Sequence, residues 1–142
     1  MPEKNVESLL SSMNPQLHND EFVFCRISES ELKSLDITPL CVFREDEGIS
    51  LIAKKRDADL KSIEYSGTWS LITCKVNSDL TAVGFLAAMS KILADAGIAV
   101  NAVSAYLHDH LFVPSDRARE ALDLLRRLAN QPIQTELRKD LP

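Results

Sequence analysis

The chain has 142 residues, 45% of them apolar and 26% charged, which suits one ordinary soluble domain or two very small units that share a core. Its net charge is −5 and its basic residues are mostly dispersed, so the composition argues against a nucleic-acid partner. No apolar run approaches the roughly 20 residues that cross a bilayer, and the acidic N-terminus is unlike a secretory signal. We expect a cytoplasmic protein without a membrane partner.

The first 62 residues read as strand-rich and poor in helix. A short helix is predicted within residues 3–13, ended by Asn14 and Pro15. Strands follow at 21–27, 39–44 and 49–54, with a hairpin loop at 45–48. Ser28 and Glu31 form a capping-box pattern for one helical turn. Residues 55–60 read as a loop or short turn, and 62–66 as an edge strand.

The second half contains the clearest periodicity. Residues 69–76 alternate as a strand, and apolar residues step at helical spacing through 79–96. Asp79 or Ser78 can cap that helix, and Gly97 is placed to end it. Strands are predicted at 98–106 and 110–113, separated by a turn at 107–109. A last helix opens with Ser115 as its cap, and residues 133–137 suit a short closing strand.

The element order from residue 68 onwards is β-α-β-β-α, with an optional terminal strand. Two amphipathic helices that each have one apolar face are expected to cover one face of an antiparallel sheet. This predicts a ferredoxin-like α+β sandwich at residues 63–142. The strand-rich residues 1–62 cannot bury much surface alone, so we expect them to pack beside the second unit.

The run from Thr68 to Leu128 resembles an ACT domain, a small βαββαβ regulatory module. It is most similar to the subgroup found in CASTOR proteins and small bacterial proteins of unknown function. The matching residues are Asp79, Thr81, Val83, Gly84, Leu86 and Ala87, then Ala96, Gly97 and Ile98, then Ser104, Tyr106, Asp109 and Val113. Residues 21–60 look similar to the degenerate N-terminal half of that subgroup. Leu107 departs from an acidic position of the pattern, and His110 stands where an aromatic residue is common.

The resemblance implies a non-catalytic regulatory module that binds a small molecule such as an amino acid, and a homodimer. The ligand is expected between the turn from Asp79 to Phe85 and the strand from Ser104 to Asp109. The backbone N–H groups of a helix N-terminus suit a carboxylate, and carboxylate and hydroxyl oxygens suit an amino group. The candidate ligand-binding residues are Asp79, Thr81, Ala82, Val83, Gly84, Phe85, Ser104, Ala105, Tyr106 and Asp109.

Structural interpretations of the same residues remain open at this point. Asp79 serves equally well as a helix cap, and Gly84 as a packing residue. The pair His108 and His110 has no third metal ligand, so a surface turn is favoured over a metal site. Cys25, Cys41 and Cys74 are expected to be reduced and buried.

No catalytic or cofactor-binding motif is present in the sequence, and we predict neither an enzyme nor a bound cofactor. The competing hypothesis is a ligand-free assembly domain that pairs with another copy through exposed sheet edges and the face that carries Trp69.

Overall fold

The computed structural model describes residues 2–131 and contains a single six-stranded antiparallel sheet within that range. The strand order is β2-β3-β1-β4-β6-β5. The strands are β1 (Pro15–Ile27), β2 (Cys41–Glu45), β3 (Gly48–Lys54), β4 (Trp69–Cys74), β5 (Asn101–Ser104) and β6 (Asp109–Pro114). The α-helices are α1 (Val6–Ser12), α2 (Glu29–Lys33), α3 (Lys55–Leu60), α4 (Phe85–Asp95) and α5 (Ala118–Asn130), the last preceded by a 3₁₀ turn at Ser115–Arg117.

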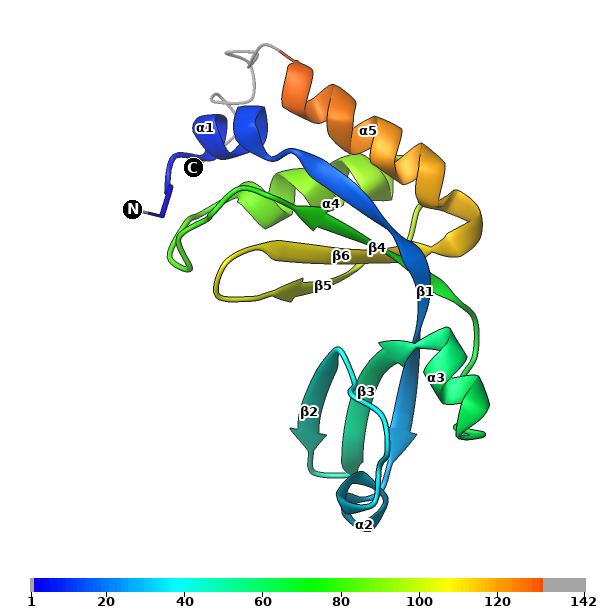
Figure 1. Ribbon diagram of the computed structural model, residues 1–142. Helices are drawn as coiled ribbons and strands as arrows, with labels where there is room; N and C mark the ends of the chain where they lie inside the picture. The colour runs from blue at the N-terminus through cyan, green and yellow to red at the C-terminus, as the bar shows by residue number, and fades with distance from the viewer. Residues whose placement is uncertain (1, 132–142) are drawn as a thin grey trace.

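Strand β1 belongs to both halves of the sheet. Its C-terminal part pairs with β3, from Phe22 opposite Lys54 to Ile27 opposite Ile49. Its first residues pair with β4, from Pro15 opposite Cys74 to Leu17 opposite Ile72, and the register breaks before Glu21. Figure 1 shows β1 running from a second wing, built of α1, α4, α5, β4, β5 and β6, into a first wing that holds β2, β3, α2 and α3.

The second wing has the predicted β-α-β-β-α order, and its strands lie as β1-β4-β6-β5. In a ferredoxin-like unit the fourth strand lies beside the first, on the edge away from the third. Here β1 occupies that edge of β4. The closing strand predicted at 133–137 lies outside the described residues. The position of the fourth strand is held by β1, which comes from the first half of the chain.

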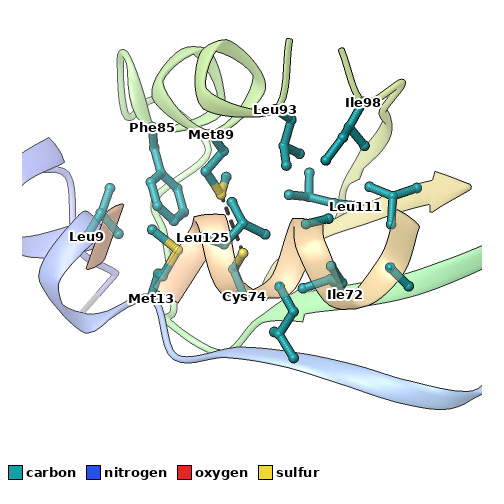
Figure 2. Close-up of a cluster of buried hydrophobic side chains, with 14 residues drawn as sticks. Leu9, Met13, Ile72, Cys74, Phe85, Met89, Leu93, Ile98, Leu111 and Leu125 are labelled. Atoms are coloured by element: carbon teal, nitrogen blue, oxygen red, sulfur yellow. Dashed lines mark hydrogen bonds between the residues drawn. The ribbon is translucent and has the colours of Figure 1, made fainter. Parts of the chain in front are cut away.

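The helices of the second wing cover one face of the sheet and bury the largest core cluster. Phe85, Met89 and Leu93 of α4 face strand residues of β4 and β6, and Cys74 Sγ donates to Met89 Sδ at 3.4 Å (Figure 2). The moderately amphipathic α4 and the strongly amphipathic α5 both place their apolar stripe here, as their spacing predicts. The fully buried members include Leu9, Met13, Ile72, Leu111, Val113, Ala121 and Leu125.

The opposite, helix-free face carries an aromatic cluster at the junction of the wings. Phe24 lies edge-on to Trp69 and to Phe112, with ring centroids 5.6 and 5.5 Å apart, and Phe22 lies 5.9 Å from Phe112. Edge-to-face pairs at such distances stabilise packing beyond their buried area. Trp69 is therefore a packing residue of this cluster.

Two of the predicted helix caps are confirmed. Gly97 has φ 71° and ends α4 in a Schellman arrangement, with Ile98 N–H donating to Leu93 O and Gly97 N–H to Ala94 O. The capping box of Ser28 and Glu31 is present at α2.

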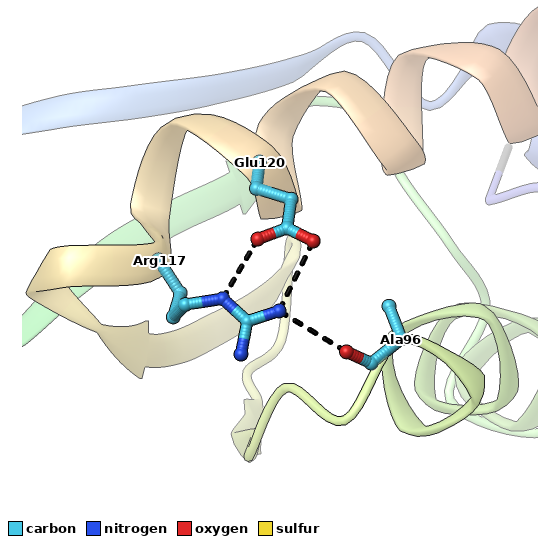
Figure 3. A network of polar contacts seen from close by, with 3 residues as sticks. All are labelled: Ala96, Arg117 and Glu120. Atoms are coloured by element: carbon cyan, nitrogen blue, oxygen red, sulfur yellow. Dashed lines mark hydrogen bonds and ion pairs between the residues drawn. The ribbon is translucent and has the colours of Figure 1, made fainter.

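Arg117, at the start of α5, donates to Ala96 O at 3.1 Å and pairs with both oxygens of Glu120 (Figure 3). It thereby places a cation at the C-terminal end of α4, where the helix dipole favours positive charge.

Other boundary predictions are wrong. Residues 55–60 form helix α3, because Ala58 is buried against the first wing and Lys55 pairs with Asp59 one turn later. No strand occupies 62–66, where Tyr65 O–H donates to Asp59. Strand β1 starts six residues earlier than predicted. Ser115 does not cap α5 and instead accepts from the Ser70 hydroxyl.

Candidate functional site

The loop between β4 and α4 is held by Asp79, which closes its own turn and does not cap the helix. Asp79 Oδ1 accepts from the Thr81 N–H at 2.8 Å and from the Thr81 hydroxyl, and Ala82 N–H donates to Asp79 O at 3.0 Å. These bonds with Thr81 lower the pKa of Asp79. The predicted capping role is wrong because the chain forms this local turn before it enters the helix.

Helix α4 begins at Phe85, six residues later than the sequence predicts. Gly84 precedes it with φ 98° and ψ −12°, a left-handed conformation that side-chain-bearing residues rarely adopt. The unpaired N–H groups of the first turn therefore belong to Phe85, Leu86 and Ala87. The predicted set from Thr81 to Gly84 is wrong as a helix N-terminus, since the N–H groups of Thr81 and Ala82 are used inside the turn.

Asp109 joins the loop to the β5–β6 hairpin. The residue is 7% exposed, and its carboxylate accepts from the Ser104 hydroxyl at 2.6 Å and from the Ser78 hydroxyl at 3.1 Å. Three chain segments meet at this carboxylate: the end of β5, the start of β6 and the loop after β4. The structure thus brings Ser104 and Asp109 together as predicted, and adds Ser78, which the sequence suggested only as a cap.

The tip of the hairpin departs from the predicted strand. β5 ends at Ser104, and Ala105 N–H donates to His108 O at 3.0 Å to close a turn. Tyr106 lies in that turn and is 81% exposed, so it does not share a strand face with Ser104. On the neighbouring loop Val83 is 85% exposed. Two large apolar side chains therefore project into solvent at this end of the molecule.

The N-terminal segment also reaches this loop. Glu3 N–H donates to Asn77 O at 2.9 Å, and Asp79 N–H donates to Glu3 O at 2.8 Å, which forms an isolated parallel bridge opposite Ser78. Val6 lies near Gly84, 3.7 Å from the position a β-carbon would occupy there. No pattern in the sequence indicates this contact, because it joins two short irregular segments that are far apart in the chain.

The histidines of the hairpin do not form a metal site within residues 2–131, which hold no group of three metal-ligating side chains. His108 Nδ1 donates to Val76 O at 3.1 Å, and His110 Nδ1 lies 2.9 Å from the Thr73 hydroxyl. A hollow of about 740 Å³ lies between α1, the start of β1 and the end of α5. It does not include the candidate residues.

None of the helices within residues 2–131 is long and apolar enough to cross a membrane.

Comparisons with known proteins agree with this architecture. Family models described as ACT domain match residues 1–70 and 64–127. A Vibrio cholerae protein of unknown function, described as a possible transport protein, is 40% identical over 89% of this chain and 98% of its own, with a TM-score of 0.78. The chain is a tandem ACT-domain protein. A search among curated protein sequences finds no significant match.

More distant structures share the fold of this tandem ACT protein. An Agrobacterium tumefaciens protein is 22% identical over 81% of this chain and 87% of its own, with a TM-score of 0.64. The ligand-free regulatory subunit of aspartate kinase from Thermus thermophilus is 12% identical over 82% of this chain and 97% of its own, with a TM-score of 0.63. The matched proteins thus include small ACT-domain proteins and an enzyme's regulatory subunit. The predicted division after residue 62 stays a prediction, because the two family matches overlap at 64–70.

Proposed function

We propose that this tandem ACT protein is a regulatory module that binds a small metabolite, most simply a free amino acid, without catalysing a reaction. The observation that carries the proposal is the pair of ACT units in a fold shared with aspartate kinase regulatory subunits. ACT domains typically bind small molecules such as amino acids. Fold alone does not fix function, so the placement of a ligand is argued from the loop geometry.

The proposed ligand lies between the loop at 79–85 and the hairpin at 104–109. Its carboxylate is placed at the first turn of α4, where the N–H groups of Phe85, Leu86 and Ala87 lack intrahelical partners. No acidic residue occupies that turn and no side chain caps it. The short helix α2 of the first wing differs, because Ser28 and Glu31 already satisfy its N-terminus. We therefore place one ligand in the second wing.

The amino group of the ligand is assigned to the carboxylate of Asp79, on the loop beside α4. Asp79 is ionised well below neutral pH, because its bonds with Thr81 lower its pKa. Asp109 is buried and already accepts two hydroxyl donors, so its proposed role is to hold the loop and the hairpin together. This revises the expectation that Asp109 contacts the ligand.

A thermal-shift screen of the protein against the twenty amino acids tests the proposal. A ligand present at 100 times its dissociation constant adds about 2.7 kcal/mol to the free energy of unfolding. Ala87→Glu places a carboxylate in the first turn of α4, which suits the helix dipole but repels a ligand carboxylate. The matched control, Ala87→Gln, has the same size without the charge.

We expect the glutamate variant to lose the shift produced by the hit and the glutamine variant to keep it. A hit that both variants retain rules out the first turn of α4 as the ligand site. The absence of any hit at millimolar concentration rules out amino-acid sensing.

The alternative is a ligand-free assembly domain, and the exposed apolar side chains of the second wing favour it. Leu80, Val83, Tyr106 and Leu107 are all more than half exposed, on the loop and hairpin described above. Sedimentation with and without amino acids separates the two functions. A homodimer that forms regardless of ligand, together with no thermal shift, supports assembly.

A further inference from the structure

A chain of hydrogen bonds crosses three strands on the helix-free face of the sheet. His18 Nε2 lies 2.8 Å from the Thr73 hydroxyl, and that hydroxyl lies 2.9 Å from His110 Nδ1. The three residues belong to β1, β4 and β6. Thr73 is 1% exposed, so its hydroxyl depends on the two imidazoles for partners.

This chain of hydrogen bonds lies where β1 is least attached to β4. The two strands are paired up to Leu17 and again from Glu21, and the register slips between these points. His18 is the first residue of this interruption. Its bond to Thr73 ties β1 to β4 where regular backbone pairing is missing, at the crossing of β1 from the second wing into the first.

The number of protons on the two imidazoles decides whether this chain of hydrogen bonds can form. A hydroxyl has one proton to donate and two lone pairs that accept. With both rings neutral, Thr73 donates to one imidazole nitrogen and accepts from the other ring's N–H. A proton added to the donating ring leaves both bonds intact. A second proton, added to the accepting ring, removes the lone pair of that ring, leaves the buried Thr73 proton without a partner and sets two cations close together.

The surrounding charges make double protonation still less favourable. His18 faces Lys75, just beyond β4, and Asp20 on its own strand, whose carboxylate already pairs with Lys54 at 3.4 Å. His110 faces His108, His18, Lys75 and Asp109. Burial is the main cause that lowers the pKa of both imidazoles, and the nearby cations lower it further.

We propose that His18, Thr73 and His110 form an acid-sensitive latch that holds the start of β1 against the second wing, and that opens when both imidazoles are protonated. The latch joins the two ACT units through the strand they share, and it does not depend on whether a ligand binds. Opening frees residues 18–20 and weakens the adjacent pairing of Gln16 and Leu17 with β4.

The test follows the full chain by NMR between pH 7.5 and 5.0. The imidazole C–H signals of His18 and His110 are expected to titrate in two separate steps, at least one of them below the ordinary value near 6.5. Amide protection at Gln16, which pairs with Thr73, is expected to fall across the second step, because opening at residues 18–20 exposes the adjacent pairing. Phe24 and Cys25, paired with β3, keep their protection.

Variants separate the latch from general acid sensitivity. His18→Gln keeps a hydrogen-bonding group that cannot titrate, so Gln16 should remain protected at pH 5.5. Thr73→Val removes the shared hydroxyl and should merge the two titration steps. The control His108→Gln removes an imidazole outside the hydrogen-bonded chain. The His110 step should move to higher pH because one nearby cation is gone, but the two separate steps and the loss of protection at Gln16 should persist.

Independent titration of His18 and His110 near pH 6.5 in the wild type overturns the proposal. Protection at Gln16 that is unchanged by pH also overturns it. If Thr73→Val does not fold, the comparison of His18→Gln with His108→Gln decides alone.

Discussion

The Ser104 hydroxyl donates to Asp109 Oδ1 at 2.6 Å, across the last residue pair of the β5–β6 ladder. The other carboxylate oxygen accepts from Ser78, so one buried group fastens the hairpin to the loop before α4. The relative position of the two segments proposed to bind a ligand thus depends on a charge that the ligand need not touch.

Replacing Asp109 with Asn should destabilise the protein and loosen the loop. The variant keeps the shape of the side chain but loses the charge that strengthens both bonds, and a hydrogen bond to a charged group contributes about 1.5–3 kcal/mol. Chemical denaturation followed by circular dichroism measures the loss. Asp95→Asn, on the exposed face of α4, is the matched control and should change the free energy of unfolding by less than about 0.5 kcal/mol. Equal effects of the two substitutions would contradict the role assigned to Asp109.

Gly84→Ala should cost about 1–2 kcal/mol through backbone strain. The space is open, since the nearest atom to an added β-carbon is Val6 Cγ2 at 3.7 Å, whereas φ is 98°. Gly84→Asn should cost less although the side chain is larger, because Asn tolerates the left-handed region better. Thermal melting of both variants ranks them. A larger loss for Asn than for Ala would indicate crowding as the cause.

Cys41 should be the first thiol to react with an alkylating reagent at pH 8. Burial is the main cause that raises the pKa of Cys74 to about 12, with a smaller contribution from Asp109, and burial raises that of Cys25. Only about one Cys74 side chain in ten thousand is then a thiolate at that pH. Cys41 is partly exposed on β2. Mass spectrometry of peptides after timed labelling gives the order, and Cys41→Ser should remove the fast phase. Rapid labelling of Cys74 would show that the core between β4 and α4 opens readily.

The free energy of unfolding should fall as the pH drops from 7.5 towards 5.5. The folded-state pKa values of His18 and His110 are lowered, so the unfolded chain takes up protons first and the stabilisation is complete only above about pH 6.5. The lowered pKa values of Glu3 and Asp79 act in a separate window, below about pH 4.5. Urea titrations at half-unit steps of pH test this. In the double variant His18→Gln, His110→Gln the free energy of unfolding should no longer change between pH 7.5 and 5.5, while its fall below about pH 4.5 should remain.

Leu125→Ala should destabilise the protein by about 2–5 kcal/mol, because Leu125 is fully buried between α5 and the sheet. Leu60→Ala provides the contrast, since Leu60 is 76% exposed at the end of α3 and its loss should be within about 0.5 kcal/mol. Denaturant midpoints measure both. Comparable losses would place Leu60 in an interface between copies.

The sequence predicts the elements whose signals are local. Helical spacing locates the body of α4, Gly97 locates its end, and Ser28 with Glu31 locates α2. The start of α4 is missed because Ala82 and Leu86 continue the apolar period through a turn that Asp79 and Gly84 impose. The role of β1 is missed because residues 15–20 are mostly polar, and their pairing with β4 depends on contacts made far along the chain.

In the candidate site, too, local contacts can be predicted from the sequence and long-range contacts cannot. Ser104 and Asp109 come together because they face each other across a hairpin, which spacing can predict. Ser78 joins them through a loop whose path depends on Glu3, and the bond of His18 to Thr73 depends on the register break in β1. Neither has a local pattern that identifies it.

The sharing of β1 has a consequence for how the chain acquires its structure. The second wing needs β1 from the first half of the sequence, and β1 needs its partner β4 from the second half, so neither half should fold when expressed alone. During synthesis the first 60 residues have to wait for β4 before the central pairing can form, and a chain interrupted there would present an unpaired sheet edge. Limited proteolysis within residues 60–68 should therefore unfold both units together and release no stable fragment.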